Sequence, residues 1–201
     1  PVGEQGQCLP RIAAIAAGWA ESVAGVQINR FCSSGLESVN MGAAKIMAGQ
    51  ADMIVSGGVE SMSRVPMLSD NGAWGSDPAI AIPTNFIPQG VSADLIATIW
   101  GYSRSDLDAL AVESHRRAAA AWDAGYFDGA IAPVIGADGK SLLSRDEILR
   151  PNATLADMAA LKPAFAAMGA AGFDRVAMNR YPQVAEVLHL HHAGNSSGIV
   201  D

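Results

Sequence analysis

The strongest constraint on this fold is a succession of three apolar patterns around a single cysteine. Residues 26–31 alternate apolar and polar side chains, which is typical of a strand. Residues 33–49 place apolar side chains three and four positions apart, which indicates a helix with one apolar face. Residues 52–56 form a second short apolar segment that ends at two glycines. Together they predict a strand–helix–strand unit with two parallel strands and a right-handed crossover.

The remainder of the chain has the pattern of helices joined by loops, with one hairpin. A strand over 130–135, followed by an Asp-Gly pair at 138–139, predicts the hairpin. Residues 103–106 have the spacing of a capping box at a helix start. We expect ordered loops over 65–90 and irregular structure over 168–193. Helices are expected over 10–18, 91–100, 104–123 and 154–162.

Charge and composition exclude several classes of protein. With 13 Lys and Arg against 20 Asp and Glu, the net charge is −7, and no basic stripe is present to bind nucleic-acid phosphates. No apolar run reaches the roughly 18 residues of a membrane span. Two cysteines do not make a disulfide framework, and no signal-peptide pattern is visible. We therefore expect a cytoplasmic protein.

Cys32 is the candidate nucleophile, because it lies where the first predicted strand gives way to the predicted helix. The free N–H groups and the dipole at a helix N-terminus stabilise an anion such as a thiolate. The same N–H groups can bind the oxyanion that forms when a carbonyl carbon is attacked. The small residues 33–35 leave room for a substrate. The alternative is a buried structural cysteine, which is how we interpret Cys8.

Four segments resemble the thiolase family, and they occur in the family's order. The segment around Cys32, residues 28–46, resembles the thiolase signature of the acyl-enzyme cysteine. Residues 57–63 resemble the segment that follows it, residues 194–201 resemble a third thiolase motif, and residues 3–7 resemble the segment ahead of the active-site strand. The resemblance extends over essentially the whole chain.

The resemblance implies an α/β fold, the layered αβαβα thiolase-like fold, which is built from two similar halves. The chain would contain a partial N-terminal half with its loop-domain insertion. Residues 1–63 would be part of the N-terminal domain with the nucleophile, and residues 64–193 would be the CoA-binding loop domain. Residues 194–201 would return into the N-terminal domain.

The resemblance also implies an acyltransferase that uses coenzyme A and acyl-CoA as substrates and has no permanently bound cofactor. Cys32 would attack the 3-keto carbon of a 3-oxoacyl-CoA, acetyl-CoA would leave, and a second CoA would accept the acyl group; the reverse condensation is the other direction. Residues 88–90 and the long stretch 168–193 depart from short-chain biosynthetic thiolases, which favours a degradative enzyme of fatty-acid β-oxidation. The family implies a homodimer or homotetramer.

Four residues match positions that contact CoA in the family. Arg150 matches an arginine near the CoA nucleotide, and a cation suits an anionic cofactor. Leu161 and Phe165 match apolar walls of the site. Ser197 matches a serine beside the pantetheine arm. Asp157 stands where many members have a serine near the adenosine, and we assign it no contact.

Three other thiolase motifs are not found in these 201 residues: Gly-His-Pro, Cys-x-Gly and Asn-Glu-Ala-Phe. We therefore expect a fragment that is inactive by itself. Two alternatives remain open: a non-catalytic acyl-CoA-binding remnant of a thiolase, and a ketoacyl synthase, which also places a cysteine at a helix N-terminus.

A histidine cluster near the end of the chain raises the possibility of a metal site. Zn²⁺ could be held by His189, His191 and His192, with Glu186 or Asp201 as a fourth ligand. Adjacent residues point apart in an extended strand, however, and we expect no metal. We also do not expect these histidines to replace the histidine of the Gly-His-Pro motif, which activates the cysteine in the family.

Overall fold

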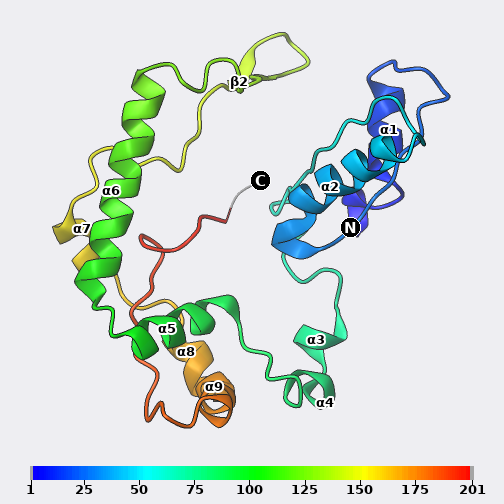
Figure 1. Ribbon diagram of the computed structural model, residues 1–201. Coiled ribbons are helices and arrows are strands. Elements are labelled where there is room, and N and C mark those ends of the chain that lie inside the picture. The colour runs from blue at the N-terminus through cyan, green and yellow to red at the C-terminus, as the bar shows by residue number, and fades with distance from the viewer. Residues whose placement is uncertain (1, 200–201) are drawn as a thin grey trace. The chain divides into compact units, whose positions relative to one another are not determined.

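The computed structural model describes residues 2–199, and the chain divides into two compact units (Figure 1). Unit 1 extends to Ser76 and also contains Ile199. Unit 2 comprises Asp77–Gly198. Both divisions fall somewhat after the domain boundaries expected at residues 63 and 193. Among the described residues, no helix has the length and apolar character that crossing a membrane requires.

Unit 1 is built around two helices, α1 and α2. Its regular elements are the 3-10 turn η1 (Gly3–Gln5), α1 (Leu9–Ala16), the 3-10 turn η2 (Phe31–Ser33), α2 (Ser34–Met47) and the short α3 (Ala73–Ser76). The helices expected over 10–18 and 33–49 are therefore confirmed, with ends shifted by one or two residues.

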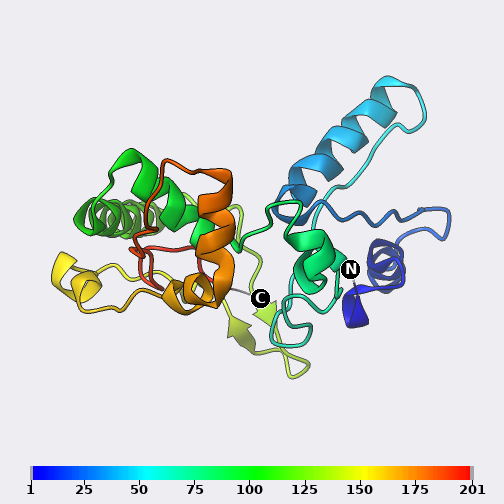
Figure 2. The same ribbon diagram turned by 90° about the horizontal axis from the view of Figure 1, so that it is seen from below.

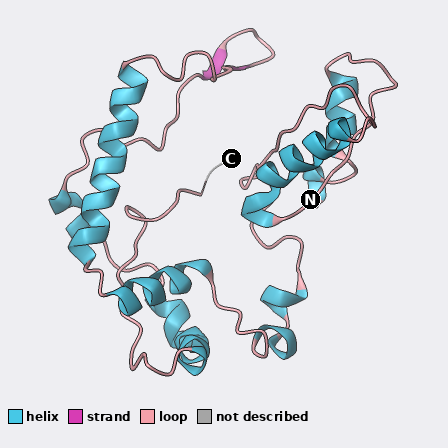
Figure 3. Ribbon diagram, viewed as in Figure 1, coloured by secondary structure: helices cyan, strands magenta, loops and turns pink. Residues whose placement is uncertain are grey.

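The two strands predicted in this unit are wrong. Residues 26–31 and 52–56 lack strand pairing, and within residues 2–199 strands occur only in a hairpin of unit 2 (Figure 3). A strand forms only where a neighbouring backbone pairs with it. Here side chains make the connections instead: Leu9 N donates to Gln27 Oε1 at 3.2 Å, and Ser56 Oγ donates to the carbonyl of Ser38 at 3.0 Å.

The apolar stripe of α2 remains open to solvent in this structure. Leu36 is 68% exposed and Val39 is 54% exposed. The one buried residue of the helix is Gly42, and a Cβ there would lie 3.1 Å from the Ile54 side chain. The helix therefore packs on residues 52–56 through a glycine, whereas Leu36, Val39, Ile46 and Met47 remain exposed.

Unit 2 contains most of the helices and the two-stranded antiparallel sheet. Its elements are α4 (Pro78–Ala81), α5 (Gln89–Trp100), α6 (Arg104–Asp123), β1 (Val134–Ile135), β2 (Ser141–Leu143), α7 (Leu155–Ala159), α8 (Ala166–Met168), the π-helical turn η3 (Gly169–Phe173) and α9 (Asp174–Arg180). The predicted helices near 91, 104 and 154 and the hairpin are confirmed. The expectation of irregular structure over 168–193 is wrong up to residue 180.

Local capping explains why two of these helices start where they do. The Ser103 side chain accepts from the N–H of Asp106, and the Asp106 carboxylate accepts from the N–H of Ser103, which completes the predicted capping box. Thr154 and Asp157 form the same box at the start of α7. Asp157, to which no CoA contact was assigned, therefore has a structural role.

The apolar core of unit 2 joins α5 to α9 and to the segment that follows α9. Its buried members are Leu95, Ala177, Val184 and Val187, with Ile87, Ile99 and Met178 packed around them. Figure 2 shows the chain after α9, in orange to red, returning beside α6 and α7. This return places residues 188–195 against helices that lie about 90 residues earlier in the sequence.

A buried carboxylate on α5 fixes the start of this returning segment. Asp94 is fully buried, and its Oδ1 accepts from the N–H groups of Leu190 and His191 at 3.0 and 2.9 Å and from His191 Nδ1 at 2.7 Å. Its Oδ2 lies 2.8 Å from His189 Nδ1, and the other ring nitrogen of His189 lies 3.0 Å from Asp174 Oδ2. The His189 ring is thus held between two carboxylates.

Burial by itself lowers the pKa of His189, but the hydrogen bonds and charges of Asp94 and Asp174 outweigh it and raise the pKa above the ordinary 6.5. A raised folded-state pKa stabilises the protein below pH 6.5, and this contribution is lost as the pH rises through the folded pKa. We predict that the free energy of unfolding falls between pH 6 and 9 more steeply in the wild type than in His189→Gln.

Urea unfolding at several pH values measures this difference. Equal slopes for His189→Gln and the wild type would contradict the assignment.

Candidate functional site

Cys32 lies in the 3-10 turn η2, directly ahead of α2, and its side chain is exposed. The sequence placed it at this junction, although the segment before it is extended loop rather than strand. Both cysteines of the chain are free thiols, and Cys8 is half-buried. Cys32 is therefore the more accessible sulfur, at the N-terminal end of a 14-residue helix.

The backbone just before Cys32 adopts an uncommon conformation that two side chains hold in place. Phe31 has a φ of 49°, in the left-handed region that residues with a Cβ seldom adopt. Asn29 Oδ1 accepts from the Phe31 N–H at 2.9 Å. Ser34 Oγ accepts from the Arg30 N–H and donates to the Phe31 carbonyl, both at 2.8 Å. These bonds close a tight turn that directs the chain into α2.

The four expected CoA-binding residues all belong to unit 2, and three of them cluster around the returning segment. Leu161 packs against the turn that begins at Gly194: a Cβ at Gly194 would lie 2.8 Å from Leu161 Cδ1 and 2.6 Å from Met158 Sδ. Phe165 packs against the start of α5, because a Cβ at Gly90 would lie 2.3 Å from its ring. The N–H of Ala164, next to Phe165, donates to the His191 carbonyl at 2.9 Å.

Ser197 belongs to the glycine-rich turn of residues 194–198, which ends the returning segment. A second buried carboxylate holds that turn in place. Asp108 of α6 is 3% exposed, and its Oδ1 accepts from His192 Nε2 at 2.8 Å and from Asn195 Nδ2 at 2.9 Å. The Asn195 Oδ1 accepts in return from the His192 N–H at 2.8 Å. His192 Nδ1 accepts from the Gly194 N–H at 3.0 Å, so the ring proton of this neutral histidine lies on Nε2.

Arg104, one helical turn before Asp108, balances the charge of that carboxylate. Its Nε donates to both carboxylate oxygens at 2.9 and 3.1 Å, and a terminal nitrogen donates to the carbonyls of Met158 and Leu161 at 2.5 and 2.9 Å. Burial by itself raises the pKa of Asp108. The hydrogen bonds from His192, Asn195 and Arg104 and the charge of Arg104 outweigh burial, so that the net pKa lies below its usual range. The carboxylate is therefore ionised.

Arg150 lies outside this cluster but is tied to the same helix. Its N–H donates to Nδ1 of His115 on α6 at 3.2 Å. Its side chain is exposed and donates to the nearby carbonyls of Glu147 and Leu149. Arg104, Asp108 and His115 fall on one face of α6, and each contacts a segment with an expected CoA-binding residue. None of the three is among the site residues expected from the sequence, although the polar face that they share on this helix was a signal that could have identified them.

The three histidines of the returning segment serve as hydrogen-bonding residues. Each bonds through its ring to Asp94 or Asp108, as described above. Within residues 2–199, no group of His, Cys, Asp and Glu side chains has the arrangement of a metal site. Asp201, the other candidate ligand, lies outside the described residues. The main effect of the three histidines is to attach the returning segment to α5 and α6.

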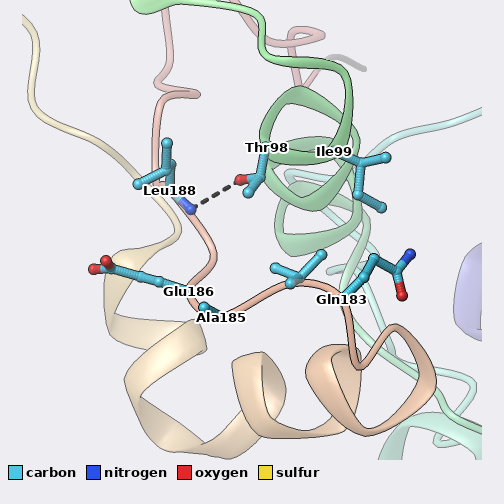
Figure 4. Close-up of a pocket in the computed structure, with 7 residues that line it drawn as sticks. Thr98, Ile99, Gln183, Ala185, Glu186 and Leu188 are labelled. Carbon is cyan, nitrogen blue, oxygen red and sulfur yellow. Dashed lines mark hydrogen bonds between the residues drawn. The ribbon is translucent and has the colours of Figure 1, made fainter.

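A separate pocket opens beside the start of the returning segment (Figure 4). It has a volume of about 360 Å³ and is lined by Thr98 and Ile99 of α5 and by Gln183, Val184, Ala185, Glu186 and Leu188. At the edge of this pocket, the Thr98 hydroxyl accepts a hydrogen bond from the Leu188 N–H at 2.9 Å. None of the expected CoA-binding residues lines it.

Comparison with known families matches residues 2–172 to the family described as "Thiolase, N-terminal domain". The chain is 38% identical over 170 residues to the beta-ketothiolase of Cupriavidus necator, covering 78% of this chain and 43% of that protein. It is also 38% identical over 180 residues to the 3-ketoacyl-CoA thiolase of Bacillus subtilis, covering 84% and 46%. The chain thus spans somewhat less than half the length of these curated relatives.

A similar solved structure is the dimeric peroxisomal thiolase of Saccharomyces cerevisiae. The TM-score is 0.68 at 34% sequence identity, over 77% of this chain and 40% of that chain. The likeness confirms the expected partial thiolase-like α/β fold, although the described residues contain only the small sheet of unit 2.

The close contact between Phe165 and α5 leads to a stability prediction. Gly90→Ala should lower the free energy of unfolding by about 1–3 kcal/mol, because the new Cβ would overlap the Phe165 ring. Gly35→Ala in α2 is the matched control: nothing lies within 4 Å of its Cβ, so the better helix propensity of alanine should raise stability by about 0.5–1 kcal/mol. Urea unfolding measures both; a stabilised Gly90→Ala variant would show that Phe165 does not pack there.

Proposed function

Since this chain belongs to the thiolase family, we propose that it supplies the acyl-accepting cysteine and CoA-binding residues of an acyl-CoA C-acyltransferase. The observation that carries the proposal is the exposed Cys32 thiol at the start of α2, within the cysteine segment that resembles thiolases. The family match and the relatives named thiolases support the same chemistry.

In the proposed reaction the Cys32 thiolate attacks the 3-keto carbon of a 3-oxoacyl-CoA. The bond between carbons 2 and 3 breaks, and its electron pair leaves with carbon 2, which takes a proton to give acetyl-CoA. The shortened acyl group remains on Cys32 as a thioester, and the thiol of a second CoA attacks it and releases the cysteine. The N–H groups at the start of α2 are suited to stabilise the oxyanions of both steps.

The CoA contacts belong to the same proposal. Leu161 and Phe165 would provide apolar walls, Ser197 would lie beside the pantetheine arm, and Arg150 would pair with the nucleotide phosphates. The clustering of Leu161 and Phe165 around the returning segment, whose turn contains Ser197, supports a shared binding surface. The exposed guanidinium of Arg150 is available to an anion.

We propose a degradative role, as in fatty-acid β-oxidation, which is supported by relatives named 3-ketoacyl-CoA thiolase. A cytoplasmic location is consistent with the two free cysteines. A homo-oligomer is supported by the dimeric yeast neighbour. Because the other three thiolase motifs are not found among the 201 residues, we propose that these residues alone do not complete turnover.

The alternative is a thiolase-like protein that binds acyl-CoA without reacting, and labelling of Cys32 separates the two. After incubation with acetyl-CoA, we predict an acetyl group on the Cys32 peptide by mass spectrometry, because thioester exchange needs a reactive thiolate at a bound acyl-CoA but breaks no carbon–carbon bond. Iodoacetamide should label Cys32 faster than Cys8, because Cys32 is exposed, and acetoacetyl-CoA should slow that labelling.

The controls are Cys32→Ser, which should carry no acetyl group, and Cys8→Ser, which should carry as much as the wild type. Slower labelling without an acetyl adduct would favour the binding-only alternative. No adduct together with equal labelling of both cysteines would overturn the catalytic assignment.

The CoA-binding role of Arg150 is tested by calorimetric titration of the chain with CoA. Arg150→Ala should weaken binding by roughly tenfold, the size expected for the loss of one charged hydrogen bond. Arg117→Ala, which removes an exposed arginine of α6 that pairs with Glu113, is the matched control and should bind CoA as the wild type does. Equal affinities for all three proteins would remove Arg150 from the site.

A further inference from the structure

We infer that Arg104 and Asp108 of α6 are positioning residues that assemble the CoA-binding surface, an inference that rests on the proposed function. Neither residue is among those expected to touch CoA. Together they hold the Leu161 backbone and the turn that contains Ser197 in one arrangement.

The two sides of the pair face different segments. The Asp108 carboxylate accepts from His192, two residues before Gly194, and from Asn195, the residue after it. The Arg104 guanidinium donates to the carbonyls of Met158 and Leu161 at the end of α7. Since Arg104 also donates to Asp108, one ion pair of α6 joins two loops that lie more than 30 residues apart in the sequence.

The ion pair between Arg104 and Asp108 is largely shielded from solvent. The Asp108 side chain is 4% exposed and the Arg104 side chain 24%, and His192 is fully buried. The charge is neutralised within the cluster, and the hydrogen-bonding groups described above have partners, as a buried ion pair requires. Removal of one member would leave a charge or a donor without a partner inside the protein.

The packing beneath the pair leaves the turn little freedom. Gly194 has Met158 Sδ, Leu161 Cδ1 and the His192 ring within about 3 Å of the position that a Cβ would take. The turn therefore lies directly on Leu161, and a displacement of either loop displaces the other. Because Asn195 is two residues before Ser197, the bond from Asn195 to Asp108 anchors the turn close to the proposed pantetheine contact.

The experiment compares CoA affinity, measured by calorimetry with CoA alone, in the wild-type chain, Asp108→Asn and Arg104→Lys. Asp108→Asn keeps the shape but replaces one acceptor oxygen by a donor, and Arg104→Lys keeps the charge but loses the planar fork. We expect roughly tenfold weaker binding in each. The double variant should be weakened by less than the product of the two single effects, because both break the same unit.

Two controls separate positioning from a general loss of stability. Glu113→Gln removes a carboxylate on the solvent-facing side of the same helix, where it pairs with Arg116 and Arg117, and should leave CoA affinity unchanged. Val187→Ala opens the apolar core of unit 2 and destabilises it without touching the turn. If Asp108→Asn weakens CoA binding no more than Val187→Ala, the pair has no positioning role.

Hydrogen exchange gives a readout that does not depend on CoA. In Asp108→Asn, the amides of residues 192–195 should exchange faster, whereas those of α9 should keep their wild-type protection. Unchanged exchange at residues 192–195 would overturn the inference, and Arg104→Lys provides the same test if Asp108→Asn fails to fold. If the wild-type chain binds no CoA but Asp108→Asn still speeds exchange at residues 192–195, the proposed function is contradicted while the role of the pair in holding the turn is supported.

Discussion

The arrangement of unit 2 depends on two buried carboxylates, Asp94 of α5 and Asp108 of α6. A carboxylate removed from water is tolerated only when several donors surround it. Asp94 finds its donors at residues 189–191, and Asp108 finds them at Arg104, His192 and Asn195. Since both sets of donors include residues of the same returning segment, a shift of that segment by one residue would remove the donors that it supplies to both carboxylates and leave Asp108 with Arg104 alone. The register of the segment, and the turn that ends it, are therefore tightly specified.

The turn before Cys32 also depends on hydrogen bonds that compensate for an unfavourable local state, here a left-handed backbone conformation at Phe31. A left-handed conformation at a residue with a side chain costs about 1–2 kcal/mol. Phe31 adopts it because Asn29 and Ser34 satisfy the backbone on either side. The result is an abrupt entry into α2 that leaves the Cys32 thiol exposed. The proposed chemistry needs such a turn, because an attacking sulfur must reach a substrate and an oxyanion must reach backbone donors.

The two candidate parts of the site are built differently. The cysteine turn is held by hydrogen bonds between residues within five positions of each other. The proposed CoA-binding residues instead lie in loops that pack against or bond to α5, α6 and one another. Local sequence motifs accordingly point to Cys32 directly. The motifs also point to Leu161, Phe165 and Ser197, but only one residue at a time. They do not show that Leu161 and Phe165 pack near the turn that contains Ser197. Nor do they show that Asp108 holds this turn in place.

The helices near residues 34, 89, 104 and 155, the capping box at Ser103 and the hairpin could be predicted from the sequence, because their causes lie within a few neighbouring residues. The family resemblance and the junction at Cys32 could be predicted for the same reason. The strands expected around Cys32 could not, because a strand exists only through a partner that is distant in sequence. The histidines show the limit most clearly: spacing suggested a metal or a loop, and only the packing of distant helices made each ring a partner for a buried carboxylate.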